Sequence, residues 1–117
     1  MGSEGTDPDL RFKKENSMLK INKSLEEATL TLALEGRLDT MTAPQLEDEL
    51  KESLKNVDTL IFDMTNLDYI SSAGLRVLLY SQKTMNRIGK MEIINVSEEV
   101  MEIFEVTGFL DILSVKQ

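Results

Sequence analysis

The chain of 117 residues contains no cysteine and no histidine. Without cysteine it has no disulfide, no thiol nucleophile and no thiolate metal ligand. Without histidine it lacks the usual general base of a serine hydrolase and a common metal ligand. Neither a dense carboxylate cluster nor a glycine-rich phosphate loop replaces these groups. We therefore expect a protein that binds no metal and no cofactor and that is not an enzyme.

Tryptophan is also absent, aromatic residues make up only 5%, and acidic residues outnumber basic ones by 21 to 13, for a net charge of −8. This composition disfavours both base stacking and attraction to phosphate backbones. No apolar run approaches the ~18–20 residues of a membrane-spanning helix, and the N-terminus has no apolar core typical of a secretory signal. We expect no nucleic-acid or membrane partner and a cytoplasmic location.

Residues 1–17 combine glycine, serine, aspartate and proline with charges of both signs. This composition predicts a flexible N-terminal tail. Met18 is a candidate natural start, and the residues before it are either a vector remnant or a natural extension. Residues 18–117 have the length of one domain.

Strand and helix periodicities alternate along residues 18–117 and predict an α/β fold. Strands are expected near Leu19–Ile21, Thr29–Leu34, Thr59–Met64, Met91–Ile94 and Phe109–Leu113. Helices are expected over Ala43–Val57 and Glu98–Thr107, with a third between them that is capped by Ser71 or Ser72 and runs through Ile88. The predicted order is β-β-α-β-α-β-α-β, with an initial antiparallel hairpin and parallel pairing after it, and hence a mixed sheet with packed helices. Its connections are expected at Ser24–Glu27, at Gly36 and at Thr65–Ile70.

Local signals refine these boundaries. Thr42 and Gln45 have the spacing of a capping box, and Met41 and Leu46 that of a hydrophobic staple. The segment Thr59–Met64 is apolar on both faces apart from its aspartate, which is typical of a central, covered strand. Ser97 is expected to cap the last helix, with Gly108 after it and Thr107 facing inward.

The segment Tyr69–Leu75 places two hydroxyls, Ser71 and Ser72, at the start of a helix. A serine there commonly caps the helix by accepting a backbone N–H. A helix N-terminus also tolerates the dianion of a phosphoryl group, so one of the two serines is a candidate phosphate acceptor. Gly74 is expected where the helix approaches another backbone closely.

Two motifs make the sequence similar to the STAS domain, the fold of the bacterial anti-sigma factor antagonists. One is Tyr69-Ile70-Ser71-Ser72-Ala73-Gly74-Leu75, and the other is Gly36-Arg37-Leu38-Asp39 after the second strand. The resemblance extends from about Met18 to Val115 and includes the predicted order of elements. It implies a STAS-like fold for residues 18–117.

The resemblance also implies partner switching. The unphosphorylated protein would bind an anti-sigma factor that is also an ATP-dependent serine kinase, and this binding would release a sigma factor. Phosphorylation of the protein by the kinase would separate the two. A serine phosphatase would then remove the phosphate and restore binding. By position the phosphorylated serine is Ser72, with Ser71 as the alternative, standing where many antagonists have aspartate. The implied partner-binding residues are Asp39, Thr40, Ser71, Ser72, Gly74, Leu75 and Arg76. We expect a monomer.

Other interpretations stay open at this point. Asp39 can form a turn or cap without touching a partner, and Arg76 can be a solvated side chain. The family also includes domains with other duties, so the chain can be a free-standing STAS subunit of a stress-sensing or lipid-transport complex.

Overall fold

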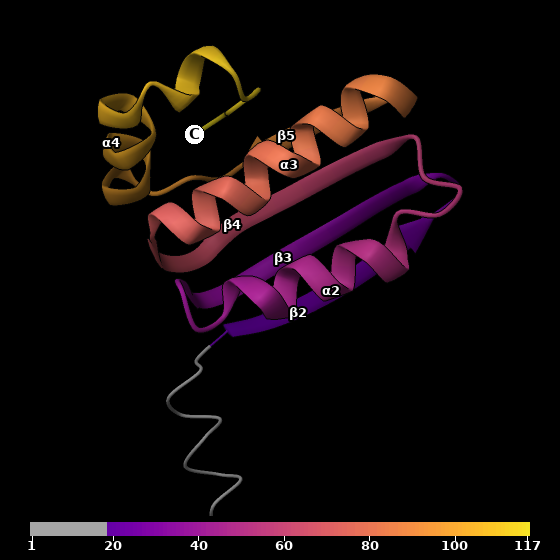
Figure 1. Ribbon diagram of the computed structural model, residues 1–117, viewed down its shortest axis with the longest axis horizontal. Helices are drawn as coiled ribbons and strands as arrows, with labels where there is room; N and C mark the ends of the chain where they lie inside the picture. The colour runs from indigo at the N-terminus through magenta and orange to yellow at the C-terminus, as the bar shows by residue number, and fades with distance from the viewer. Residues whose placement is uncertain (1–18) are drawn as a thin grey trace, which may run out of the picture.

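The computed structural model describes residues 19–117, so the predicted tail over 1–17 lies outside the described residues. The described chain forms four strands, three α-helices and a short 3-10 turn (Figure 1). In order these are β2 (Leu19–Glu26), β3 (Thr29–Leu38), α2 (Ala43–Ser53), β4 (Thr59–Ile70), α3 (Ser72–Ile88), β5 (Lys90–Ile94), α4 (Glu98–Thr107) and η1 (Phe109–Asp111). No helix in this part of the chain has the length and apolar character needed to cross a bilayer.

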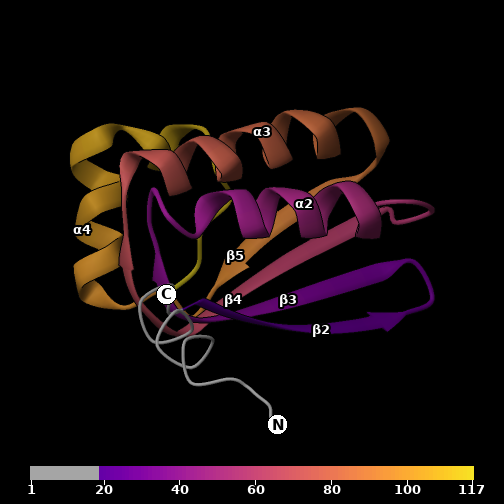
Figure 2. The same ribbon diagram turned by 60° about the horizontal axis from the view of Figure 1, so that its bottom comes forward.

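The strands form one mixed sheet in the order β2-β3-β4-β5. β2 pairs with β3 antiparallel, whereas β3 with β4 and β4 with β5 pair parallel. Helices α2 and α3 lie side by side on one face of the sheet, and α4 lies at one end of it (Figure 2). The predicted α/β class and the mixed sheet are confirmed.

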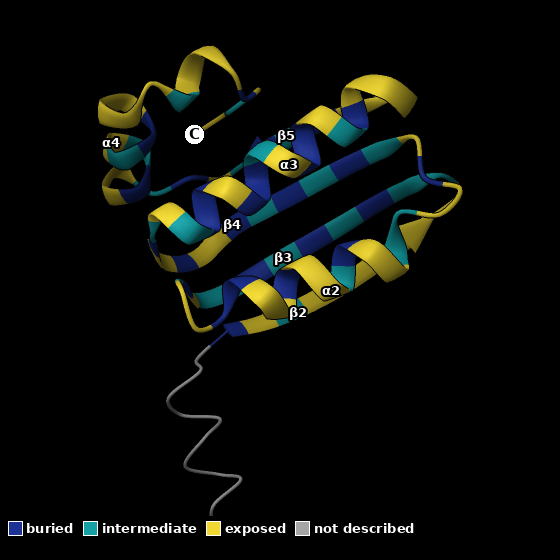
Figure 3. Cartoon of the chain, viewed as in Figure 1, coloured by how far each residue is buried: buried dark blue, intermediate teal, exposed yellow. Residues whose placement is uncertain are grey.

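Alternation along the strands builds the core beneath α2 and α3. In β3, Leu30, Leu32 and Leu34 are at most 1% exposed, while the residues between them are only half-buried (Figure 3). β4 shows the same alternation, so Ile61 and Asp63 lie half-buried on the opposite face. The prediction of a strand covered on both faces is therefore wrong for β4, because α2 and α3 both pack on the other face.

The two central strands are longer than predicted. Gly36, with φ 102°, does not end β3, which continues through an irregular register to Leu38. β4 continues alongside it, so the predicted linker Thr65–Ile70 is the second half of a strand that pairs Ile70 with Leu38. A bulge of this kind bends a strand without ending its pairing. The predicted hairpin connection at Ser24–Glu27 is also shorter, because β2 and β3 pair as far as Glu26 and Thr29.

The start of α2 differs from the predicted capping box. Thr42 is fully buried and makes no side-chain cap; its Oγ1 donates to the carbonyl oxygen of Arg37 at 2.8 Å. Gln45 instead donates to the carbonyl oxygen of Leu19. Met41 is 76% exposed, which excludes the predicted staple. The helix also ends at Ser53, short of the predicted Val57.

The C-terminal part confirms one prediction and corrects two others. Ser97 caps α4 by accepting from the backbone N–H of Val100 at 3.2 Å, as predicted. Thr107, predicted to face inward, is exposed. Residues Phe109–Leu113 form no strand; the chain turns at η1 and rejoins the sheet only through a parallel bridge between Val115 and Ile93. The closing β-element is thus a single bridge, placed later than expected.

Candidate functional site

The two serines of the predicted site occupy different positions at the start of α3. Ser71 is the N-cap: its backbone is extended, and its Oγ accepts from the N–H of Gly74 at 3.4 Å. Ser72 is the first helical residue and is exposed. The capping and the exposed hydroxyl therefore belong to separate residues, which leaves the hydroxyl of Ser72 open to solvent.

The start of α3 is held against the end of β3. The N–H of Ser71 donates to the carbonyl oxygen of Leu38 at 2.9 Å. A Cβ added to Gly74 would lie 2.7 Å from Cγ of Leu38 and 2.9 Å from its carbonyl oxygen. Gly74 is therefore required by the close approach that the sequence predicted. Because Asp39 follows Leu38 directly, this packing brings the two motifs together.

Asp39 organises the turn between β3 and α2. Its Oδ1 accepts from the N–H of Met41 at 3.0 Å and of Thr42 at 3.1 Å. Burial opposes ionisation of Asp39, but these two amides, the Thr42 hydroxyl and Arg37 together hold the pKa of its carboxyl below the ordinary value. Asp39 therefore forms a turn, as one of its two interpretations predicted. The N–H groups that its carboxylate accepts belong to Met41 and Thr42, which precede the first helical residue, so α2 has no side-chain cap.

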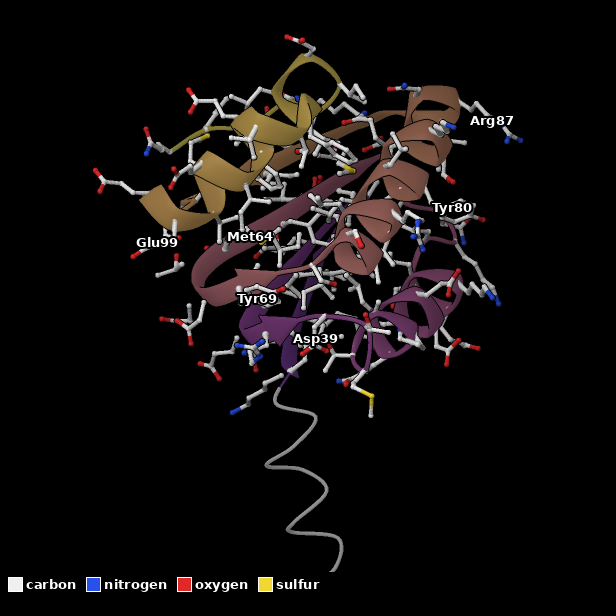
Figure 4. The ribbon with its side chains drawn as sticks, turned by 60° about the vertical axis from the view of Figure 1, so that its left-hand side comes forward. Asp39, Met64, Tyr69, Tyr80, Arg87 and Glu99 are labelled. Carbon is white, nitrogen blue, oxygen red and sulfur yellow. The ribbon has the colours of Figure 1, made fainter. Side chains whose placement is uncertain are left out.

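Arg37 links the same turn to the end of β4. Its guanidinium carbon lies 4.3 Å from the ring centroid of Tyr69, and its Nε is 3.4 Å from Oδ2 of Asp39. Asp39 and Tyr69 are labelled in Figure 4, on the strand ends that lead to α2 and α3. Sequence reasoning assigned no role to Arg37 or Tyr69, although both lie within the two motifs; their contact depends on the register between β3 and β4.

A groove of about 260 Å³ begins beside these loops and runs between α2 and α3. Its lining includes Thr40, Pro44, Glu47, Ala73, Arg76 and Tyr80. Of these residues Thr40 and Arg76 were predicted to bind a partner and Ala73 lies in the serine motif, whereas no role was predicted for Pro44, Glu47 or Tyr80. The spacing of Tyr80, two helical turns after Ser72 and so near the same side of the helix, is a signal in the sequence that marks the groove, and its ring is exposed in the structure.

The predicted site residues thus divide by exposure. Thr40, Ser72 and Arg76 are exposed, and Asp39 and Ser71 are partly exposed. Gly74 and Leu75 are buried; Leu75 is only 4% exposed. The structure brings the first group to one surface, whereas Gly74 and Leu75 lie beneath it and support the start of α3.

Comparison with known proteins finds the same architecture. The family model of the STAS domain matches residues 18–117. A Bordetella bronchiseptica protein named as an anti-sigma factor antagonist, BtrV, is 35% identical over 99 residues, which are 83% of this chain and 85% of that protein. Among solved structures, an anti-sigma factor antagonist from Mycobacterium paratuberculosis has a TM-score of 0.78 at 15% identity, covering 86% of both chains. The Bacillus protein SpoIIAA in its phosphorylated form has a TM-score of 0.65 at 18% identity, covering 85% of this chain and 91% of that one.

Proposed function

Because the chain belongs to the STAS domain family, we propose that it is an anti-sigma factor antagonist controlled by phosphorylation of Ser72. In its unphosphorylated form it binds an anti-sigma factor that is also a serine kinase, and this binding releases a sigma factor. Transfer of a phosphoryl group to Ser72 ends the complex, and a serine phosphatase restores it. The protein is a monomeric regulator without catalysis of its own. A protein that controls a sigma factor must be present where transcription takes place, so we also propose a cytoplasmic location.

One observation carries the proposal: the hydroxyl of Ser72 is exposed at the first position of α3 while Ser71 caps the helix. A kinase needs a hydroxyl that is open to solvent and not already committed to the fold. The exposed residues Thr40 and Arg76 lie on the groove beside it and offer contacts to the same partner. The names of the curated relative and of the solved structures support the same role.

Phosphorylation of Ser72, which we call the switch, acts at the surface that contacts the anti-sigma factor. A phosphoryl group adds about −1.5 to −2 charges near neutral pH. The N-terminus of a helix stabilises negative charge through its dipole and unpaired N–H groups, so the fold tolerates the group. A partner surface that fits a neutral serine does not tolerate the phosphoryl group, because burying an unpaired charge costs several kcal/mol.

Binding of the purified anti-sigma factor from the same organism, measured by titration calorimetry, tests this role. We expect Ser72→Asp to weaken binding at least about tenfold, or ~1.4 kcal/mol, and Ser72→Ala to bind as the unchanged protein does. After incubation with ATP, mass spectrometry is expected to find phosphate on the unchanged protein and on Ser71→Ala, and none on Ser72→Ala.

Two outcomes would contradict the assignment. Phosphate on Ser71 alone would move the switch to the N-cap, and undiminished binding by Ser72→Asp would exclude control at this position. Failure of the unchanged protein to bind the anti-sigma factor, with co-purification of a membrane transporter from native cells, would favour a subunit of a lipid-transport complex.

A further inference from the structure

Helix α3 has a charge opposite to that of the protein as a whole. The chain carries 21 acidic residues and 13 basic ones, for a net charge of −8. The residues of α3 include Arg76, Lys83 and Arg87 and no aspartate or glutamate. By contrast, α2 and α4 each contain four acidic residues, and between them a single basic one, Lys51. The three cations of α3 are therefore a local exception in an acidic molecule.

These cations form a line that starts at the proposed phosphorylation site. Successive residues of an α-helix are rotated by about 100°, which places Lys83, Arg76, Arg87 and Tyr80 within about 80° of Ser72 around the helix axis. All five residues are exposed, and Tyr80 is 53% exposed. Tyr80 and Arg87 project from α3 on the side away from α4 and Glu99 (Figure 4). We call these five residues, Ser72, Arg76, Tyr80, Lys83 and Arg87, the α3 stripe.

The cations of the α3 stripe form no ion pair within residues 19–117. Within residues 19–117 the ion pairs are those of Lys23, Arg37 and Lys116, and none involves the stripe. Glu47 lines the same groove as Arg76 without forming an ion pair with it.

Helix stability explains only part of this pattern. Lys83 and Arg87 are four residues apart, a spacing at which like charges destabilise a helix. Arg87 does lie in the last turn, where the helix dipole favours a cation, but this does not apply to Arg76 or Lys83. Helix stability alone would not select this arrangement.

We propose that the α3 stripe is the docking surface for an acidic segment of the anti-sigma factor that recognises Ser72, an inference that rests on the proposed function. The stripe is about 22 Å long from Ser72 to Arg87, enough to contact an extended or helical acidic segment over several residues. Tyr80 supplies a rigid aromatic contact at its centre, a residue type enriched at binding interfaces. Long-range attraction to the stripe lets an acidic partner approach a molecule whose other helices would repel it.

The same arrangement strengthens the effect of the switch. Phosphate on Ser72 adds about −1.5 to −2 charges one helical turn from Arg76 and so cancels much of the positive charge of the stripe. An acidic partner would then meet a weakened attraction along the whole of α3 in addition to a charge at the serine itself.

A double charge reversal far from Ser72 tests the stripe. Lys83→Glu/Arg87→Glu leaves the serine and its loop unchanged and is expected to weaken binding of the anti-sigma factor about tenfold or more near 50 mM salt. The loss should shrink near 500 mM salt, where screening shortens the range of charge interactions. The matched control is Lys20→Glu/Lys55→Glu, which changes the net charge equally at two exposed lysines outside α3 and should bind within about twofold of the unchanged protein.

A zero-length carbodiimide cross-link gives a second measurement, because it joins a lysine amine to a carboxylate only in direct contact. We expect Lys83 to be joined to an aspartate or glutamate of the anti-sigma factor. If binding occurs and depends on Ser72 but the stripe reversal behaves like the control, the inference about the stripe is wrong and the proposed function stands. If the unchanged protein does not bind at all, the proposed function fails. A cross-link from Lys83 to an acidic residue of α4 in a second copy of the chain would identify the stripe as a self-association surface and overturn the inference.

Discussion

Asp39 is the residue on which the geometry of the loop before α2 depends. Its carboxylate accepts two backbone N–H groups and contacts Arg37, which in turn stacks on Tyr69. Through these contacts one ionised side chain connects the ends of β3 and β4 to the start of α2. A charge that holds a turn also makes the stability of the turn depend on pH.

We predict that Asp39→Asn lowers the free energy of unfolding at about pH 7. We also predict that the free energy of unfolding of this variant falls less on acidification than that of the unchanged protein. The pKa of Asp39 lies below the ordinary value of 3.8 in the folded protein. Its ionised form therefore stabilises the fold above that value, and this contribution is lost as the pH falls through the lower, folded pKa. Urea unfolding should show a difference in the free energy of unfolding between the two proteins at about pH 7 and a smaller difference at about pH 3. Asp68→Asn, at an exposed position, is the control, and parallel curves for Asp39→Asn and the unchanged protein would contradict the prediction.

At the scale of elements, the site depends on how closely α3 approaches the strand ends. Gly74 is the third residue of α3, and in a helix alanine is more favourable than glycine by up to about 1 kcal/mol. The Cβ of an alanine at this position would lie 2.7 Å from Leu38 Cγ, 2.9 Å from Ile70 Cγ1 and 2.9 Å from the backbone oxygen of Leu38. The side chains of Leu38 and Ile70 can shift slightly, but the backbone oxygen of Leu38 is part of β3 and cannot. We therefore expect the steric clash to outweigh the gain in helix propensity and to lower the free energy of unfolding.

We therefore predict that Gly74→Ala lowers the free energy of unfolding by up to about 2 kcal/mol, which is an overpacking cost of about 1–3 kcal/mol less a gain of about 1 kcal/mol in helix propensity. Urea denaturation monitored by circular dichroism measures this change. Ser72→Ala, two residues earlier and exposed, should change stability by no more than about 0.5 kcal/mol and serves as the control. A Gly74→Ala protein as stable as the unchanged one would mean that α3 can move away from Leu38 without cost.

For the whole molecule, the proposed switch requires a fold that does not respond to the modification. We predict that Ser72→Asp leaves the circular dichroism spectrum unchanged and alters the free energy of unfolding by less than about 0.5 kcal/mol. The reason is that Ser72 is exposed and a negative charge in the first turn of a helix is slightly stabilising. Light scattering should find a monomer before and after the change. A loss of more than about 1 kcal/mol, or a new oligomer, would indicate that the switch acts through refolding or assembly.

The sequence alone determined the features that depend on local pattern. Alternating leucines in β3, the spacing of apolar residues in α3 and the Ser97 cap all follow from steric and hydrogen-bonding preferences of short segments. The element order and the position of the two motifs followed from the same patterns.

Tertiary structure decided what depends on contacts between distant segments. Pairing of Leu38 with Ile70 makes the predicted linker a strand. Thr42, predicted to cap α2, is buried and donates its hydroxyl to the carbonyl oxygen of Arg37. The packing of α2 beside α3 also created the groove at Arg76 and Tyr80. No single segment contains this information, because each of these features joins residues whose distance is set only when the sheet register and the helix packing are both established.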